Sequence, residues 1–535
     1  MSWNIVNGFV SDSEDAISVI QRKDLLLSCI SGLMLTLCQP PFDISVFSWI
    51  AVVPLFIASV RLKSLKQSFI IGCMSGFVHF MTLLYWLTVA MKQYGNMPAL
   101  LSVMVLILVC AILSLYIGIA ASVTAFVGLK DVKSIFVISG VWIGLEFIRG
   151  YIPHLGFPWC LLGYSQHDIT VIAQLSAVTG VYGISYLILL VNCCIAHFFI
   201  VRSKYDLTTL YIFIISILIT TSAIVAGVWR SSLSVEKYDS ASLRVSIIQP
   251  SIDQSIKWDR NYQSKTMKLY EDLTRFCFPF KPDIIVWPET AVPFFLQEQK
   301  SYVAQIQEMA FESNSSIILG SPAYNEEKNR INTEYYNRAY YISGNSGILD
   351  YHDKVHLVPF GEYVPLADKL PFLNKFIPMA GSFVSGEKLI PLKGGSSVSP
   401  GVLICFEAIF PDLARSYAKN DADLLVNITN DAWFGRTGAP YQHLAMTKFR
   451  SIETGLPIVR AANTGISALI LPSGRIVEQS GLFEKIVLNG ELPVGNKIQT
   501  PYVNMGDWFL IIAAGTAAFL LLMMQYKKRI VSREE

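Results

Sequence analysis

The sequence predicts a multi-domain membrane protein in which hydrophobic helices precede a globular α/β domain. Hydrophobic residues make up 53% of the 535 residues and charged residues only 15%, whereas an average soluble chain has about 25% charged residues. The hydrophobic residues are concentrated in residues 25–229 and in a short run that follows residue 507. Residues 240–500 instead have the mixed composition of a globular domain, with strand-like and helix-like segments in alternation.

Eight segments are expected to cross a membrane, because a spanning helix needs about 20 mostly apolar residues. The first is cut short by Pro40 and Pro41, and a cleaved signal peptide is the alternative for it, although the acidic stretch upstream does not fit the basic start of such a peptide. The expected spans are residues 25–39, 46–60, 67–91, 98–128, 134–148, 169–200, 207–229 and 508–525.

The basic residues of the short loops predict the orientation of these spans, because Lys and Arg are enriched on the cytoplasmic side. With a cytoplasmic N-terminus, the loops on the opposite side hold only Lys92, Arg149 and Arg230. The expected arrangement is a cytoplasmic N-terminus (1–24), a seven-helix transmembrane domain (25–229), an extracytoplasmic domain (230–507), an eighth transmembrane helix (508–525) and a cytoplasmic tail (526–535). The net charge of +2 and the lack of a basic block argue against a nucleic-acid partner.

The extracytoplasmic segment is expected to form an α/β domain with helices packed outside its sheets. Short runs rich in Ile, Val and Tyr predict strands at 243–249, 283–287, 316–319, 335–342, 402–405, 424–427 and 457–461. Helices are expected near 261–277, 297–312 and 440–455.

Three predicted strands carry residues that are suited to covalent catalysis. Glu289 follows a strand and a proline, Lys354 lies within a strand-like run, and Cys405 ends a fully apolar strand. Loops at strand ends converge on one crevice in α/β folds, so we expect the three side chains to meet. A carboxylate could then take the proton of the thiol, and an ammonium could stabilise an oxyanion. Taken singly, Glu289 also fits a surface acid and Cys405 an inert buried thiol.

Four sequence motifs strengthen this interpretation. They are WPET at 287–290, KVHLVPFGE at 354–362, CFE at 405–407 and NITNDAWFG at 427–435. In this order they resemble the nitrilase superfamily, whose members use a Glu–Lys–Cys triad on an αββα sandwich. Together with the predicted spans, and with GFPW at 156–159 and GYSQ at 163–166, they resemble one branch of it over essentially the whole chain, the apolipoprotein N-acyltransferases.

The resemblance implies a role for each matching residue. Glu289 would be the general base, Lys354 the oxyanion stabiliser and Cys405 the nucleophile. Glu362 and Glu407 match acids beside the triad, with a loop carboxylate paired to a surface cation as the alternative for each. Supporting and substrate-facing positions complete the set: Asn337, which would brace the site by hydrogen bonding, and Trp258 and Trp433, which would line the substrate entrance or else simply pack in the core.

One position departs from the family pattern. The residue after the nucleophile is commonly Tyr in the family and is Phe406 here. A catalytic role for that hydroxyl is therefore doubtful, whereas the backbone N–H of Phe406 remains available as an oxyanion donor.

The implied reaction transfers a fatty acyl chain from a phospholipid to Cys405, and then to the α-amine of the N-terminal S-diacylglyceryl cysteine of an apolipoprotein. It implies a multi-pass protein of the bacterial inner membrane, with the catalytic domain facing the periplasm, and it requires no cofactor. We expect no metal site, because the seven histidines lack metal-binding spacing, and we expect a monomer. The Pro- and Phe-rich segment 366–383 is expected to cover the site and to contact lipid.

Several alternatives stay open at this point. A membrane-tethered amidase or nitrilase-type hydrolase would use the same triad, and a transporter or scaffold would carry a degenerate domain, although only Glu146 places a charge inside a predicted span. A disulfide between Cys277 and Cys405 would make the latter structural. His356, two residues after Lys354, could pair with Cys405 or serve only in packing.

Overall fold

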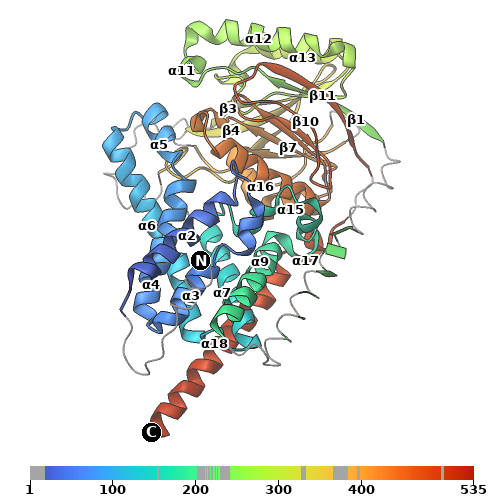
Figure 1. The fold of residues 1–535 in the computed structure, drawn as a ribbon. Coiled ribbons are helices and arrows are strands. Elements are labelled where there is room, and N and C mark those ends of the chain that lie inside the picture. Colours follow the sequence, from blue (N-terminus) through green and yellow to red (C-terminus); the bar gives the residue numbers. More distant parts are fainter. Residues whose placement is uncertain are drawn as a thin grey trace, which may run out of the picture.

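The computed structural model describes residues 19–152, 156–201, single helical positions between 211 and 228, and residues 241–326, 333–364, 383–394, 398–495 and 499–534. A block of helices forms one half of the molecule, and two β-sheets with their covering helices form the other half (Figure 1). The C-terminal helix returns to the helical block and projects beyond it (Figure 1).

The helical block follows the predicted spans closely. Helices lie at six of the seven segments predicted before the α/β domain, and the seventh, 207–229, lies largely outside the described residues. The elements are α2 (Arg22–Leu37), η1 (Ser45–Trp49), α3 (Val53–Leu62), α4 (Leu65–Leu83), α5 (Leu87–Val89), η2 (Ala90–Tyr94), α6 (Ala99–Val127), α7 (Val132–Tyr151), η3 (Leu162–Gln166), α8 (Thr170–Ala173), α9 (Ser176–Ile200) and α18 (Trp508–Glu534).

Not every helix of this block is long and apolar enough to cross a membrane. Within the described part of the chain, four segments are: Ser45–Leu62, Ala99–Val127, Ser176–Ile200 and Trp508–Lys527. A fifth, made of Leu65–Leu83 and Leu87–Tyr94, qualifies if the two helices count as one bent span. The protein is therefore a membrane protein by the length and composition of its helices.

The third predicted span, 67–91, is not one straight helix. The chain bends by 56° between α4 and α5. Trp86 lies in the bend, is buried, and donates its indole N–H to Oε1 of Gln442 in the α/β domain at 3.1 Å. Its ring also packs against Trp159 and Phe434. Tertiary contacts of this kind outweigh local helix propensity, so hydropathy alone does not predict the bend.

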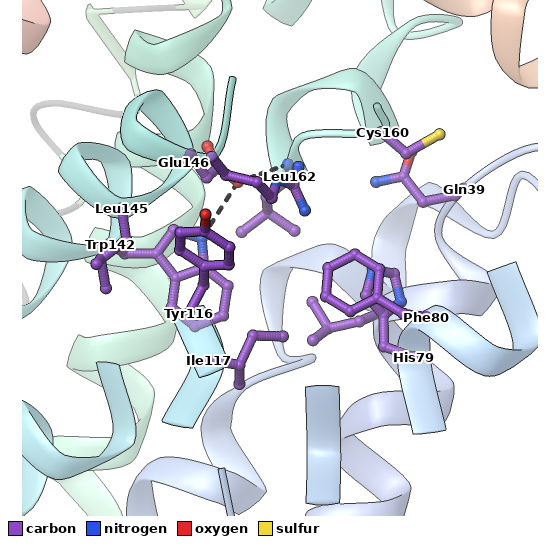
Figure 2. Close-up of a pocket in the computed structure, with 12 residues that line it drawn as sticks. Gln39, His79, Phe80, Tyr116, Ile117, Trp142, Leu145, Glu146, Cys160 and Leu162 are labelled. Carbon is purple, nitrogen blue, oxygen red and sulfur yellow. Dashed lines mark hydrogen bonds between the residues drawn. The ribbon is translucent and has the colours of Figure 1, made fainter. Parts of the chain in front are cut away.

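A small, mainly apolar cavity lies inside the helical block, between α2, α4, α6 and α7. Its volume is about 40 Å³, and Figure 2 shows the side chains that surround it. Glu146 of α7 accepts hydrogen bonds there from the indole of Trp142 and from the backbone N–H of Leu162. Arg149, which the charge count assigned to a loop, lies instead in the last turn of α7 and is buried.

The α/β domain contains two mixed sheets. One has the strand order β11–β1–β2–β3–β4–β5 and the other β10–β9–β8–β7–β6, with parallel pairing within β1–β3 and within β6–β8. The strands are β1 (Ser242–Gln249), β2 (Ile284–Val286), β3 (Ser316–Glu326), β4 (Thr333–Ser343), β5 (Gly347–Asp353), β6 (Pro400–Ile404), β7 (Leu424–Thr429), β8 (Ile458–Ala462), β9 (Ala468–Ile470), β10 (Ile476–Gln479) and β11 (Ile486–Pro493).

The two sheets pack face to face, and helices cover both outer faces. Apolar side chains from both sheets, such as Val245 and Val426, form a common buried core between them. On the outer face of the first sheet lie α12 (Gln263–Phe276) and α13 (Lys300–Glu312), at the end of the molecule farthest from the helical block (Figure 1). On the second lie α15 (Pro411–Lys419) and α16 (Ala439–Thr454), whose residues share one hydrophobic core with α9 and other helices of the block. The αββα sandwich is confirmed, and one of its helical layers also contacts the membrane helices.

Some elements differ from the sequence prediction. All seven predicted strands and all three predicted helices are present, with ends shifted by a few residues except in β3, which was predicted to end at 319 but continues to Glu326. Strands β9 to β11 and helix α15 were not predicted. The run that contains Lys354 was expected to be strand-like, but β5 ends at Asp353, so Lys354 begins a loop. The short elements α11 (Gln254–Lys257), η4 (Arg260–Tyr262), η5 (Phe278–Phe280), η6 (Leu296–Glu298), η7 (Cys405–Ile409), η8 (Asp431–Phe434) and α17 (Pro501–Met505) complete the domain.

Candidate active site

Cys405 lies at the sharp turn where β6 ends and η7 begins. Its φ of 54° is in the left-handed region, which non-glycine residues occupy rarely. Two side chains hold this turn through the carbonyl oxygen of Cys405: Nε2 of His443 lies 3.2 Å away, and Nδ2 of Asn427 donates over 3.4 Å. The backbone at the thiol is therefore fixed from the second sheet and from α16.

Glu289 and Lys354 meet beside this turn. Nζ of Lys354 lies 3.7 Å from Oε1 of Glu289, and both side chains are buried. Nδ2 of Asn337 donates to the same oxygen at 2.8 Å, while the backbone N–H of Asn430 donates to Oε2 at 2.8 Å. Glu289 is thus held by a cation and two hydrogen-bond donors, as a buried carboxylate requires.

Glu362 belongs to the same cluster. It accepts a hydrogen bond from Nζ of Lys354 at 2.9 Å, and its Oε1 also accepts from Nδ2 of Asn337 at 2.9 Å. The backbone N–H of Val358 donates to its other oxygen at 2.8 Å. The alternative of a carboxylate paired with a surface cation does not apply, because the partner ammonium of Lys354 is buried.

Glu407 connects the loop of Lys354 to the turn of Cys405. Its carboxylate is fully buried and accepts from the backbone N–H groups of Ile404, Val355 and His356 at 2.6, 2.6 and 3.0 Å. Burial opposes the charged form, but His352 and these backbone donors outweigh it and lower the pKa of Glu407. The predicted surface-cation alternative does not apply here either, because Glu407 ties two loops together inside the protein.

The charges around Cys405 act on its thiol in opposite directions. Burial raises the pKa of the thiol, the carboxylate of Glu289 raises it further, and the ammonium of Lys354 lowers it. Burial disfavours the ammonium of Lys354, but Glu362 and Glu289 outweigh burial and raise its pKa above the ordinary value. Lys354 therefore stays charged, and a thiolate on Cys405 would depend on nearby positive charge.

The aromatic residues divide into exposed and packed ones. Trp258 is 50% exposed, which excludes the core-packing alternative for it, and Trp433 is 37% exposed with its ring 5.3 Å from that of Tyr94. Phe406 is buried against Phe157 of the helical block, with ring centroids 6.4 Å apart. The segment 366–383, expected to cover the site, lies outside the described residues except for Phe383.

The disulfide alternative for Cys405 is wrong. Cys277 and Cys405 are both free thiols, and Cys277 is packed in the core between the first sheet and its helices. His356 packs its ring 3.9 Å from that of Phe410, which agrees with the packing interpretation.

The sequence prediction missed four polar residues around the site. His443 contacts Oδ1 of Asp431 at 3.1 Å, and the guanidinium of Arg460 donates to Oδ2 of Asp431 at 2.7 Å, all in the interior. Lys257 donates to the carbonyl oxygen of Glu289 at 3.2 Å. Asp431 lies within the motif at 427–435 and Lys257 directly precedes Trp258, so the only available signal was their closeness to these positions. Nothing in the sequence marked His443 or Arg460.

A separate group could in principle hold a metal ion. The donor atoms of Asp43, His167 and Asp168 lie within 4.8 Å of one another. However, Nζ of Lys448 already lies 2.6 Å from Oδ1 of Asp168, so a cation is present in this group. The group forms a polar contact between α16 and the loops of the helical block.

Comparison with known proteins agrees with both halves of the architecture. The family described as apolipoprotein N-acyltransferase N-terminal domain matches residues 31–194, and carbon-nitrogen hydrolase matches residues 244–502. An apolipoprotein N-acyltransferase from Geobacter metallireducens is 38% identical over 519 residues, covering 96% of this chain and 97% of its own. One from Brucella suis is 33% identical, covering 88% and 89%. A solved amidase from Nesterenkonia sp. is 18% identical with a TM-score of 0.36, covering 47% of this chain and 90% of its own.

The alignment with these relatives covers nearly the full length of the chain, the helical block as well as the αββα domain. Similarity to a hydrolase domain alone would not explain the match over the helical block. The chain belongs to the apolipoprotein N-acyltransferase family.

Proposed function

We propose that the protein transfers a fatty acyl chain from a membrane phospholipid to the α-amine of the N-terminal S-diacylglyceryl cysteine of apolipoproteins, through a thioester on Cys405. The observation that carries the proposal is the position of Cys405. Its thiol interacts electrostatically with the carboxylate of Glu289 and the ammonium of Lys354. The same domain contains helix α16, which shares a hydrophobic core with the membrane helices. A nucleophile placed in this way is close to a source of lipid.

In the first half-reaction, Glu289 takes the proton of Cys405 and the thiolate attacks the ester carbonyl of the phospholipid. The ammonium of Lys354 and the backbone N–H of Phe406 stabilise the oxyanion. Collapse of the intermediate breaks the ester C–O bond, and the protonated Glu289 gives its proton to the departing lysophospholipid. In the second half-reaction the neutral amine attacks the thioester, Glu289 takes a proton from the nitrogen, and Cys405 leaves and is reprotonated.

The remaining assigned residues have supporting roles in this proposal. Glu362 and Asn337 position Lys354 and Glu289, to which they are hydrogen-bonded. Glu407 fixes the two loops that carry Lys354 and Cys405. Trp258 and Trp433 line the entrance for the lipid substrates, which fits their exposure at the surface.

We assign the protein eight transmembrane helices with the predicted boundaries, including 207–229, and place residues 230–507 on the periplasmic side of the inner membrane. The distribution of basic residues between the loops supports this orientation. The protein would act as a monomer, because Glu289, Lys354 and Cys405 come from one chain.

Mass spectrometry of the purified protein after incubation with phospholipid tests the proposal. Cys405 should gain an acyl group and lysophospholipid should appear, and addition of a diacylglyceryl peptide with a free α-amine should then yield an N-acylated peptide. Cys405→Ser should show neither product. Cys277→Ser, which alters a free thiol away from the site, should behave as the unchanged protein. Free fatty acid as the main product would instead support the hydrolase, and an unmodified Cys405 would contradict the proposal.

A further inference from the structure

A second lysine, Lys257, is buried at the site with no role in the reaction described so far. It is the last residue of the short helix α11 and only 1% of it is exposed, whereas the next residue, Trp258, is half exposed. Its Nζ donates to the carbonyl oxygen of Glu289 at 3.2 Å. Burial of an ammonium is costly unless other charges compensate it, so its position requires an explanation.

The segment that carries Lys257 is fixed to the site by further hydrogen bonds. Oε1 of Gln254 accepts from Nδ2 of Asn430 at 2.8 Å, and Asn430 in turn donates its backbone N–H to Glu289. Ile252 and Asn463 exchange two hydrogen bonds at 3.0 and 2.8 Å. The backbone that carries Lys257 is therefore held at the site.

The charges around Cys405 indicate what Lys257 compensates. Lys354 is already shared between two carboxylates, those of Glu289 and Glu362. The other acids nearby have partners of their own, since Asp431 is paired with Arg460 and Glu407 lies 3.7 Å from His352. With Lys354 alone, the cluster of Glu289, Glu362 and Lys354 would carry a net negative charge next to the thiol. Lys257 makes the cluster neutral.

We propose that Lys257 is a positioning residue of the acyl-transfer site: its ammonium holds the turn of Glu289 and stabilises the thiolate of Cys405. The inference rests on the proposed function of Cys405 as nucleophile. It adds a second cation, from α11, that acts on the nucleophile together with Lys354.

The protonation of Lys257 is consistent with this role. Burial lowers the pKa of its ammonium to about 8, while Glu289 and Cys405 act to raise it. The ammonium is therefore present at neutral pH and is lost as the pH rises through about 8. Because the interaction of two titrating groups is mutual, a thiolate that raises the pKa of Lys257 has its own formation favoured by Lys257.

The rate of alkylation of Cys405 by iodoacetamide, measured against pH by mass spectrometry without lipid, tests the inference. Lys257→Gln keeps a donor for the carbonyl of Glu289 but removes the charge. We expect roughly tenfold slower alkylation of its Cys405 at neutral pH, where the ammonium is present, and a smaller difference above about pH 8, where the unchanged protein also loses this charge. Lys257→Arg keeps the charge and should stay close to the unchanged protein. Lys268→Gln removes an exposed ammonium of α12 and controls for net charge.

An alkylation rate of Lys257→Gln at neutral pH equal to that of the unchanged protein would overturn the inference, as would an equal loss of rate in Lys257→Arg and Lys257→Gln. The unchanged protein supplies a measurement that does not depend on the folding of a variant. Its alkylation rate should rise less steeply above pH 8, where the ammonium is lost, and a constant slope through pH 8 would count against the inference. The alkylation test is independent of acyl transfer. A protein whose Cys405 is alkylated as expected but forms no acyl-thioester would refute the proposed function and not the role of Lys257.

Discussion

At the scale of single residues, Glu362 determines where the ammonium of Lys354 can lie. We expect Glu362→Gln to slow acylation of Cys405 about 100-fold, because a misplaced donor at an oxyanion site costs on the order of 10² to 10³ in rate. The measurement is the rate of lysophospholipid release. Glu298→Gln, at an exposed position of η6, should leave the rate unchanged. A Glu362→Gln protein with normal kcat would show that Lys354 does not need this partner.

Asp431 gives a prediction about pH. Burial would raise the pKa of its carboxyl, but Arg460 and His443 outweigh burial and lower it to about 2. A depressed carboxyl pKa stabilises the fold above the unfolded value of about 3.9, and this stability is lost as the pH falls from about 4 towards 2. The melting temperature should therefore fall over this range.

Asp431→Asn should remove part of that acid sensitivity and should destabilise the protein at pH 7 by about 3 kcal/mol, because Arg460 loses its buried partner. Melting curves of both proteins at about pH 3 and at pH 7 would provide the comparison, because the linked stability is lost below about pH 4. Equal melting temperatures at pH 7 would contradict this account of the Asp431–Arg460 pair.

The residues that gather at the site could be predicted from the sequence only where they lie in a recognisable motif. Glu289, Lys354 and Cys405 stood out because each interrupted or ended an apolar run. Lys257 did not, because a lysine at the end of a short helix is usually exposed and its burial depends on contacts distant in the chain. His443 was missed for the same reason: it lies in an ordinary helical stretch, and its place at the site depends on contacts distant in the chain.

At the scale of elements, the bend between α4 and α5 presents Trp86 to the α/β domain. Trp86→Phe keeps a ring in place but removes the hydrogen bond to Gln442, so we expect a loss of about 1–2 kcal/mol. Trp86→Ala should cost about 3–5 kcal/mol. Thermal unfolding in detergent measures both, and Trp258→Phe at the surface is the matched control. Equal effects of Trp86→Phe and Trp258→Phe would refute a role for the hydrogen bond.

Elements that were strongly apolar were predicted well, and others were not. The strands β1, β6 and β7 are almost wholly buried, and their Ile, Val and Leu content identified them. Strand β10 is only partly buried and carries Glu478 and Gln479 at its end, so its composition resembles that of a loop. Its pairing with β9 is a tertiary property that local composition does not contain.

At the scale of the whole molecule, Gln442 links the two halves. Its Oε1 accepts from the indoles of Trp86 and Trp159 at 3.1 and 2.7 Å. Its Nε2 donates to the carbonyl oxygens of Pro40 and Leu83 at 3.0 and 3.4 Å. The neighbouring His443 contacts the carbonyl of Cys405. One buried amide thus joins three segments of the helical block to the helix that supports the nucleophile.

We expect Gln442→Leu to leave four buried polar partners without a hydrogen bond. The free energy of unfolding should then fall by several kcal/mol, and phospholipid turnover should fall at least about tenfold. Alkylation of Cys405 by iodoacetamide, which needs no lipid, should fall much less. Gln305→Leu in α13, on the opposite outer face, is the matched control. Parallel losses of turnover and alkylation would indicate general damage to the site rather than misalignment of the two halves.

Helix α7 is constrained on two sides by different chemistry. Its Glu146 and Arg149 border the cavity of the helical block, whereas Gly140 and Gly144 allow the backbone and side chains of α18 to approach closely. A helix that turned about its own axis would expose charge to lipid on one side and would lose its tight contact on the other. The rotation of α7 about its own axis is therefore fixed, and the other helices of the block pack around a helix that does not turn.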